Sequence, residues 1–408
     1  MSKIALTPNA SGAGVFTIAA PNSGTNRTLT LPDEDGTLLT SVGGSTGNLT
    51  VTGNLSVDGG TIKLDGNYPV GTSNVALGDA ALDAITTGGN FNTAIGTSAL
   101  TANTSGYENT AIGYNAMLSN TTGLSNVAVG STTLDANTIG GSNTAVGRAA
   151  LGANTEGYYN TAVGYHTLFS NTTQSNSTAV GYQAGYSNTS GGVQAFGYLA
   201  LRANTTGIQN HAFGNQALDA NTTGAYNTAM GGYALSANTT ASNNTAVGYQ
   251  AGYSNTTGAA LTAIGQNALR SSTTASNNVA VGQDSLYTLT TGTGNAVLGT
   301  AAARGMTTGN YNTVMGQEAL KSNTTASENV AVGYRAMITN TTGADNTAVG
   351  PDSMYDNTTG QKNAAFGKAS LGDNTTGDFN VAIGPYAMRL NTTASYNTAV
   401  GYQGLYAN

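Results

Sequence analysis

Few side chains in this sequence could carry acid–base or metal chemistry. Among 408 residues there are two histidines, His166 and His211, and no cysteine. Three copies of His211 around an oligomer axis would offer nitrogen ligands to a metal ion, but a plain polar role for each histidine is the simpler interpretation. The 19 carboxylates are spread along the chain, and no pair recurs at a spacing that would mark a glycosidase. We therefore expect no enzymatic activity, no metal site and no cofactor.

Tyrosine is the most suggestive residue type, with 21 copies. Exposed aromatic side chains can stack on sugar rings, and they can also shield the edges of hydrogen-bonded ladders. Many tyrosines recur either at place six of a repeated unit or near the turn that closes the unit. The first set is Tyr114, Tyr165, Tyr182, Tyr249 and Tyr334, and the second is Tyr107, Tyr158, Tyr226, Tyr311 and Tyr396. Sugar binding and shielding are both open interpretations of these sets.

The element that must position these side chains is a seventeen-residue repeat. One copy, NTAIGYNAMLSNTTGLS, begins at Asn109. The glycine at its fifth position recurs with this period throughout, apart from one interval that is longer by a single position and one that is shorter. These glycines are Gly78, Gly96, Gly113, Gly130, Gly147, Gly164, Gly181, Gly197, Gly214, Gly231, Gly248, Gly265, Gly282, Gly299, Gly316, Gly333, Gly350, Gly367, Gly384 and Gly401. Self-similarity at a short fixed period indicates a solenoid, in which each repeat stacks on its neighbours.

We number the places of the repeat from that asparagine as place 1. The residue types that recur at a place indicate what the structure requires there. Place 1 is Asn in 17 of 20 copies, as at Asn109, and Asn returns at place 12, as at Asn120. Place 3 is Ala in all but two copies, for example Ala111 and Ala246. Place 4 is always large and apolar, place 8 is small, and place 9 is mostly Leu or Met. The invariant glycine of place 5 indicates a bend that needs positive φ.

These columns predict an all-β fold, a parallel β-solenoid or β-roll of about twenty turns between residues 73 and 408. Gly, Asn and Thr at these densities disfavour helix. We expect two short strands in each turn, one at places 2–4 that is buried on both faces and one around places 8–9. Stacking at about 4.8 Å per turn makes the Asn columns into amide ladders and gives a rod on the order of 95 Å long.

Composition narrows the class of partner. Charged residues make up 8% of the chain, and 12 Lys and Arg against 19 Asp and Glu leave a net charge of -7. Without a basic cluster, no nucleic-acid partner is expected. The first residues lack the apolar core of a signal peptide, so we expect synthesis in a cytoplasm without Sec-type export.

Two further segments precede the repeat. Residues 1–45 read as a small β unit with a turn at Asp35-Gly36, and residues 46–72 alternate like the short strands of a slender stalk. In the first segment, the sequence FTIAAPNSGTNRTLTLPDEDGTLLTS resembles the N-terminal part of tail-fibre and other tail proteins of bacteriophages. In those proteins such a segment precedes the fibre shaft, so the resemblance implies attachment to phage tail or baseplate proteins.

The repeat itself resembles the head domains of trimeric bacterial autotransporter adhesins, whose turns carry a similar Ala-Ile-Gly element in a left-handed parallel β-roll. Their usual turn is shorter than the one in this chain, and neither their heptad stalk nor their membrane barrel is seen in this sequence. The resemblance implies a homotrimer. The small residue of place 3 agrees with that, because Ala fits a confined contact, either within the coil or between chains.

Together these features predict the structural and receptor-binding tail fibre of a bacteriophage, located in the virion tail after synthesis in the host cytoplasm. Its expected partners are further copies of itself, tail or baseplate proteins at the N-terminus, and a host surface polysaccharide or outer-membrane component. A bacterial surface adhesin or extracellular matrix filament is the main alternative. A polysaccharide-depolymerising tailspike is the third.

The sequence ends at Asn408, which is place 12 of a further copy. We expect the strand edge there to be covered, either by a domain removed after assembly or by another protein. Host contacts are expected at variable, outward places of these distal turns. The candidates are Tyr386, Arg389, Tyr396, Tyr402 and Tyr406. Their aromatic rings favour a polysaccharide receptor over a protein receptor.

Overall fold

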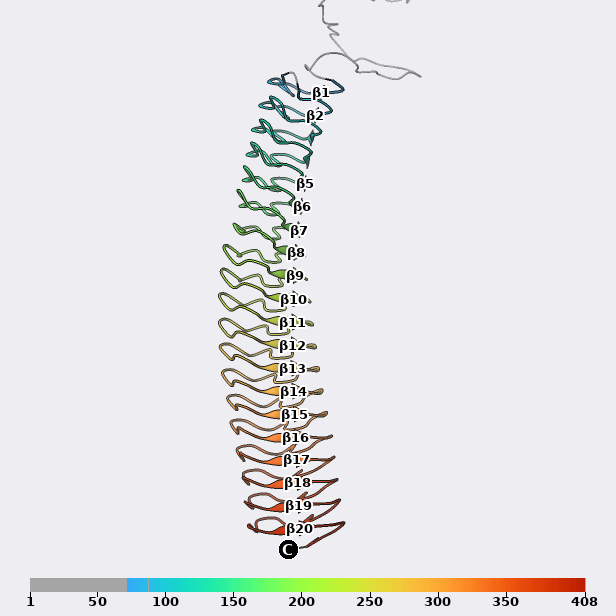
Figure 1. The fold of residues 1–408 in the computed structure, drawn as a ribbon, viewed down its shortest axis with the longest axis vertical. Helices are drawn as coiled ribbons and strands as arrows, with labels where there is room; N and C mark the ends of the chain where they lie inside the picture. Colours follow the sequence, from blue (N-terminus) through green and yellow to red (C-terminus); the bar gives the residue numbers. More distant parts are fainter. Residues whose placement is uncertain (1–71, 87, 408) are drawn as a thin grey trace, which may run out of the picture. The chain divides into compact units, whose positions relative to one another are not determined.

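The computed structural model describes residues 72–86 and 88–407, so residues 1–45 and nearly all of 46–72 lie outside the described part. The described chain is an all-β parallel solenoid in which each coil corresponds to one copy of the repeat and carries one short strand, which confirms the predicted fold class. Figure 1 shows the strands stacked along the axis. They are β1 (Val75–Leu77), β2 (Thr93–Ile95), β3 (Thr110–Ile112), β4 (Val127–Val129), β5 (Thr144–Val146), β6 (Thr161–Val163), β7 (Thr178–Val180), β8 (Gln194–Phe196), β9 (His211–Phe213), β10 (Thr228–Met230), β11 (Thr245–Val247), β12 (Thr262–Ile264), β13 (Val279–Val281), β14 (Ala296–Leu298), β15 (Thr313–Met315), β16 (Val330–Val332), β17 (Thr347–Val349), β18 (Ala364–Phe366), β19 (Val381–Ile383) and β20 (Thr398–Val400).

Neighbouring strands pair in parallel, place for place. Ala229 of β10 lies opposite Ala212 of β9 and Ala246 of β11. The coil that is shorter by a single position keeps this register, because Ala179 of β7 still faces Ala195 of β8. The coil is therefore shortened outside the strand. Residues at the same place of the repeat lie above one another along the axis, as the sequence predicts.

The prediction of a second strand around places 8–9 is wrong. Places 6–10 form a tight turn, in which places 7 and 9 have positive φ, for example 61° at Tyr233 and 50° at Leu235. Tyr233 N–H donates to the Asn215 carbonyl in the coil before, whereas Leu235 N–H donates to the Ala251 carbonyl in the coil after. In a regular strand, residues two apart direct their N–H groups to the same side. The turn thus makes inter-coil hydrogen bonds without being a strand.

Leucine at positive φ is unusual, and its burial explains it. A left-handed conformation costs an L-residue about 1–2 kcal/mol, whereas fully burying a leucine side chain stabilises the fold by about 1.5–3 kcal/mol. Leu235 is 1% exposed. The turn therefore directs the column of place 9 into the coil with a net gain in stability.

The glycines of place 5 end each strand at a bend with positive φ, as predicted. Gly231 has a φ of 132°, and a Cβ atom built on it would lie 2.6 Å from the carbonyl oxygen of Gly248 in the next coil. The dihedral angle and the lack of space each exclude a side chain. Two independent requirements thus fall on the same place, which explains why every copy carries glycine there.

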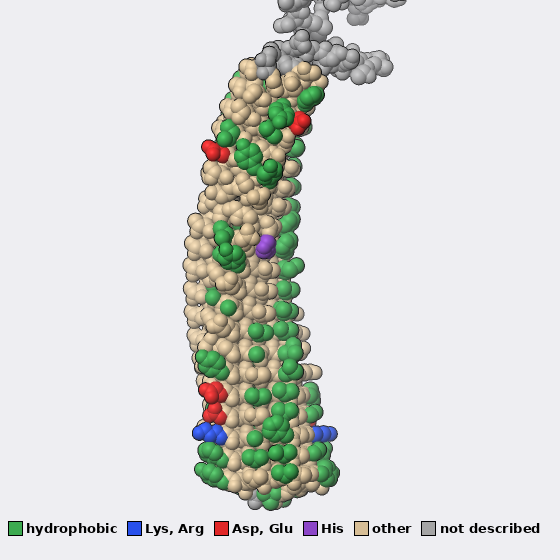
Figure 2. All heavy atoms as spheres, in the orientation of Figure 1, with side chains coloured by type: hydrophobic (Ala, Val, Ile, Leu, Met, Phe, Trp, Pro, Cys, Tyr) green, Lys and Arg blue, Asp and Glu red, His purple; other side chains and the backbone are tan. Residues whose placement is uncertain are grey.

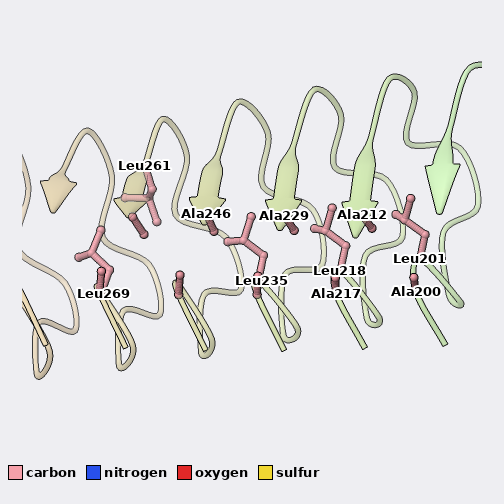
Figure 3. Close-up of a cluster of buried hydrophobic side chains, with 14 of the residues drawn as sticks. Ala200, Leu201, Ala212, Ala217, Leu218, Ala229, Leu235, Ala246, Leu261 and Leu269 are labelled. Atoms are coloured by element: carbon pink, nitrogen blue, oxygen red, sulfur yellow. The ribbon is translucent and has the colours of Figure 1, made fainter. Parts of the chain in front are cut away.

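The core is a thin layer between the strands and the turns. Ala229 and Ala246 point inward from β10 and β11, on the side where Leu218 and Leu235 point inward from the turns (Figure 3). Ala246 has no exposed surface in the single chain. The confined contact of place 3 is therefore within the coil, so the alanine column gives no support for a contact between chains.

The two Asn columns form the predicted amide ladders. Asn221, at place 12, donates to Asn204 Oδ1 in the preceding coil at 2.7 Å and accepts from Asn238 Nδ2 in the following coil at 2.8 Å. The carbonyl of Gly224 accepts from Asn221 Nδ2 at 3.0 Å and from Asn210 Nδ2, in the place 1 column, at 2.7 Å. Because buried amides need partners, these ladders tie each coil to the next and close the loop between the columns.

Candidate functional site

The strand at places 2–4 is not buried on both faces as expected. Its central residue points inward, but the large apolar residue of place 4 stays partly in solvent, for example 37% exposed at Phe213 and 46% at Met230. We call the place 4 side chains the outer stripe. Its members are Leu77, Ile95, Ile112, Val129, Val146, Val163, Val180, Phe196, Phe213, Met230, Val247, Ile264, Val281, Leu298, Met315, Val332, Val349, Phe366, Ile383 and Val400. Figure 2 shows a band of hydrophobic side chains running along one side of the coils.

The outer stripe is apolar along its whole length of about 90 Å, at about 4.8 Å per coil. Place 2 beside it carries Thr, Val, Ala, Gln or the single His211 in the described strands, and no carboxylate, Lys or Arg. Contiguous exposed apolar patches often mark interaction sites. The outer stripe has the length and polarity of such a surface.

A second face, which we call the turn face, consists of the side chains of places 6, 7, 10 and 11. Tyr165, Tyr182 and Tyr198 occupy place 6 of three successive coils, with ring centroids 5.4 Å apart and planes 7° and 15° from parallel. Stacked rings cover one another's faces and present their edges to solvent. For this set the geometry favours shielding over the stacking of a sugar on a ring face.

Near the last coils the turn face is hollowed into a groove of about 310 Å³, which we call the distal groove. Its lining combines cations, carboxylates and two tyrosines. The lining residues are Arg335, Asp352, Tyr355, Asp356, Lys368, Ala369, Gly372, Asp373, Tyr386 and Arg389. They come from places 6, 7, 10 and 11 of four successive coils, so it is the stacking of coils that brings them together.

Ion pairs and rings hold the cations of the distal groove in place. Arg335 Nη2 lies 2.9 Å from Asp352 Oδ1, and its guanidinium carbon lies 5.0 Å from the centre of the Tyr355 ring. Arg389 Nε lies 3.3 Å from Asp373 Oδ1. Each partner restricts the rotamers of a long side chain, so the groove presents charged groups in an ordered arrangement.

Asp356 is the perturbed carboxyl of the distal groove. Burial raises the pKa of Asp356 above its ordinary value, the neighbouring carboxylate of Asp373 raises it further, and Arg389 opposes both effects. The two carboxylates stand at place 11 of adjacent coils. A polar groove in which carboxylates alternate with guanidinium groups is suited to hydrogen-bonding the hydroxyl groups of a sugar.

The structure brings some of the predicted receptor-contact residues close together and places others apart. Tyr386 and Arg389 line the distal groove, and Tyr402 lies edge-on to Tyr386 with ring centroids 6.2 Å apart. Tyr396 instead stacks on Phe379 at place 17, with ring centroids 5.0 Å apart. Tyr406 is exposed in the last coil and is not part of the groove lining.

The sequence analysis did not single out the other charged and aromatic residues of the groove, which are Arg335, Asp352, Tyr355, Asp356, Lys368 and Asp373. A signal for the groove was present at place 11. That place is Ser, Ala, Thr or Gly in nearly every coil and is Asp only at Asp356 and Asp373. Two successive departures in one column of a solenoid put like charges side by side, which is costly without a compensating role.

The histidines do not form a shared site within the chain. His211 is half-buried at place 2 of β9, whereas His166 stacks on Tyr165 with ring centroids 4.0 Å apart. Burial lowers the pKa of His166, and Arg148 lowers it further. Across the described coils, no group of three or more potential ligand side chains could hold a metal ion. No helix in that same part is long and apolar enough to cross a membrane.

No protein-family model matches this sequence, and a search of curated proteins finds no match either.

Proposed function

We propose that this protein is the structural and receptor-binding tail fibre of a bacteriophage, a homotrimer that contacts the host surface and belongs to the virion tail. The outer stripe is the observation that carries the proposal, because it gives a long thin solenoid a surface along which copies can associate. The phage-like sequence before the repeat supports attachment to tail or baseplate proteins. The proposal assigns the protein no nucleic-acid partner, no cofactor and no catalytic step.

The occupant of the outer stripe is another copy of the chain. A partner must present an uncharged apolar surface about 90 Å long with side chains about every 4.8 Å. A parallel copy of the same solenoid meets that requirement in register, and burial of the apolar area favours association without charge pairs. Three copies, as in the adhesin heads that the repeat resembles, would close the stripes around one axis and leave the turn faces in solvent.

Receptor contact then belongs to the turn face, and first to the distal groove. Tyr386, Arg389 and Tyr402 lie together there, beside the carboxylates of Asp356 and Asp373. Such a groove offers both donors and acceptors, which suits a host surface polysaccharide or the glycan of an outer-membrane component. Tyr396 and Tyr406 remain candidates for a second contact.

Assembly is tested by placing a charge in the outer stripe. Ile264→Glu puts a carboxylate into the proposed interface, where it would lose its hydration. Light scattering should then show the mass falling from three times the chain mass of 40.7 kDa to that of one chain. Gln266→Glu is the matched control, because it adds the same charge on the turn face of the same coil. A single-chain mass for the unaltered protein would overturn the trimer, and equal masses for both variants would move the interface elsewhere.

The location of the protein distinguishes the phage-fibre proposal from the bacterial-filament alternative. Antibodies against the solenoid should label the tail fibres of purified virions. Labelling of the surface or matrix of phage-free bacteria instead would favour the adhesin or matrix filament.

One observation favours the depolymerising tailspike as a second candidate, namely the raised pKa of Asp356 next to Asp373. A carboxyl group with a raised pKa beside an ion-paired carboxylate resembles the acid and base pair of a glycosidase. Release of reducing ends from host polysaccharide, lost in Asp356→Asn, would establish it. The fibre proposal expects no such release.

A further inference from the structure

A second hollow lies on the turn face, in the coils of β13–β15. Its volume is about 320 Å³, and its lining residues are Tyr287, Thr288, Arg304, Gly305, Lys321 and Ser322. The lining contains two cations and three side chains with a hydroxyl group, and none of these six residues is a carboxylate. Gly305 leaves room where other coils carry a side chain at place 11. The hollow thus differs from the distal groove, whose cations are matched by three aspartates.

The hollow belongs to a longer column at place 10. We call Tyr253, Arg270, Tyr287, Arg304 and Lys321 the cation–ring column, since they occupy place 10 of five successive coils. The guanidinium carbon of Arg270 lies 5.5 Å from the centre of the Tyr253 ring and 5.6 Å from that of Tyr287. That of Arg304, in the coil on the other side of Tyr287, lies 5.3 Å from the same ring. Rings and cations therefore alternate along the axis from Tyr253 to Arg304.

This alternation decides which chemical groups the column can offer. Tyr287 lies between two guanidinium groups, so its faces are occupied and a sugar cannot stack on them. What faces outward is the ring edge with its hydroxyl group, together with the N–H donors of arginines that the rings hold in place. Guanidinium groups bind carboxylate and phosphate through paired N–H donors. The column is thus suited to anionic groups rather than to neutral sugar rings.

The cations of the column are only partly neutralised by the protein. Arg270 Nε donates to the neutral amide of Gln250 at 2.9 Å, and none of the ion pairs among the described residues involves Arg270. The closest approach of Arg304 to Asp284 is 4.0 Å, at the limit of an ion pair. Lys321 is the exception, with Glu318 at 2.7 Å. The two arginines keep most of their capacity to bind an anion.

We propose that the cation–ring column binds an acidic polysaccharide of the host surface, whose carboxylate or phosphate groups contact Arg270 and Arg304 while the polymer runs along the axis. The inference names the ligand class for the proposed function and rests on it for the source of the polymer. The two arginines are two coils apart, so the polymer should carry anionic groups about 10 Å apart. Lys321 would extend the contact by one coil.

The same place of an earlier coil shows that the cations are local. A comparable hollow of about 280 Å³, formed around Phe169, has the carboxylate of Asp135 at place 10. Burial raises the pKa of that carboxyl group, and once ionised it would repel an anionic polymer. With a net charge of -7, the chain as a whole also repels polyanions. Binding must therefore come from the column itself.

The test measures binding of the purified full-length protein to pairs of polymers that differ in charge. Polygalacturonate is compared with its methyl ester, and a phosphate-bearing mannan is compared with plain mannan. At low salt, binding to at least one acidic member should be ten or more times tighter than to its neutral match, and should weaken as salt is added. The acidic polymer that binds more tightly identifies carboxylate or phosphate as the recognised group.

Variants assign the binding to the column. Arg270→Gln combined with Arg304→Gln should weaken binding at least tenfold, and Arg270→Lys, which keeps the charge but loses the paired donors, should lie between. Arg148→Gln is the matched control, because Arg148 also lies near a tyrosine, with its guanidinium carbon 5.9 Å from the centre of the Tyr165 ring, but belongs to another region of the turn face. Its binding should be unchanged, and the mass and melting temperature of every variant should match the unaltered protein.

Equal binding to charged and neutral polymers, or full binding by the double variant, would overturn the inference. These outcomes are independent of the proposed function. If acidic polymers bind but virions are not labelled, the column stands as a site on a bacterial filament. If virions are labelled but acidic polymers do not bind, the fibre stands and the column is only structural.

Discussion

The strand face, which carries the outer stripe, and the turn face arise from the same repeat, yet they differ in how much variation they accept. Place 4 on the strand face is Val, Ile, Leu, Met or Phe in every coil, although its side chains stay partly in solvent. Place 10 on the turn face ranges from Asp through Gly, Ser and Tyr to Arg and Lys. Packing between neighbouring coils contributes to this uniformity, since the Phe196 and Phe213 rings stack with centroids 4.8 Å apart, and the proposed contact between copies of the chain would restrict place 4 further. The difference teaches that place 4 accepts only apolar side chains, whereas the turn face is free to carry local chemistry.

The largest effect is expected where both faces depend on one residue. Gly231→Val would impose a positive φ on a branched residue and drive its side chain into the backbone of Gly248. Strain and overpacking together should cost about 3 kcal/mol or more, and hydrogen exchange should rise in the coils around β10 on both faces. Gly232→Val is the control, because a Cβ atom there meets the Tyr249 ring at an ordinary 3.5 Å. Equal melting of the two variants would contradict the bend.

A smaller effect, confined to the strand face, is expected beneath the outer stripe. Ala246→Phe overfills the core of one coil at a cost of about 1–3 kcal/mol, and β11 should be pushed outward so that association also weakens. Ala260→Phe in the same coil is the control, since place 17 is exposed and the chain already carries Phe91 and Phe379 directly before the place 1 asparagine. Melting temperature and solution mass are the measurements. If Ala246→Phe lowered neither, place 3 would not be confined.

The smallest effect is expected on the turn face. Burial and Asp373 raise the pKa of Asp356 in the folded protein, so the folded state binds more protons than the unfolded state just above the ordinary value of 3.8. Stability therefore falls as pH rises through that window, and the deficit persists at neutral pH. Asp356→Asn should raise the melting temperature slightly at pH 7 and leave it unchanged near pH 3. Screening in the open groove keeps the gain within about 0.5 kcal/mol.

Asp345→Asn is the control for that measurement, because it removes an exposed carboxylate at place 17. The same melting curve is expected for this variant and the unaltered protein at both pH values. A loss of stability in Asp356→Asn at pH 7 would mean that the charged carboxylate is stabilised by its neighbours, and would reverse the sign of the argument.

The repeat columns were sufficient to predict the solenoid, the bends and the amide ladders. Gly231 and Asn221 each stand in a column whose residue type indicated one physical role, and the structure confirms both roles. For Ala246 the sequence left open a confined contact within the coil or between chains, and the structure places that contact within the coil. The distal groove could not be predicted in the same way. Asp356 and Arg389 belong to coils that are separated by a whole further coil, and only the stacking of those coils brings both side chains to one groove.

What the sequence by itself determined is the period, and with it the stacking of identical places. What only the tertiary structure decided is whether the side chains of an apolar column point into the coil or away from it. An apolar column fits the interior of a coil and an exposed interface equally well, so the pattern could not tell Leu235 from Met230. The backbone decides between them, because positive φ at places 7 and 9 turns the leucine inward, whereas the alternation of a strand turns place 4 outward once alanine faces the core.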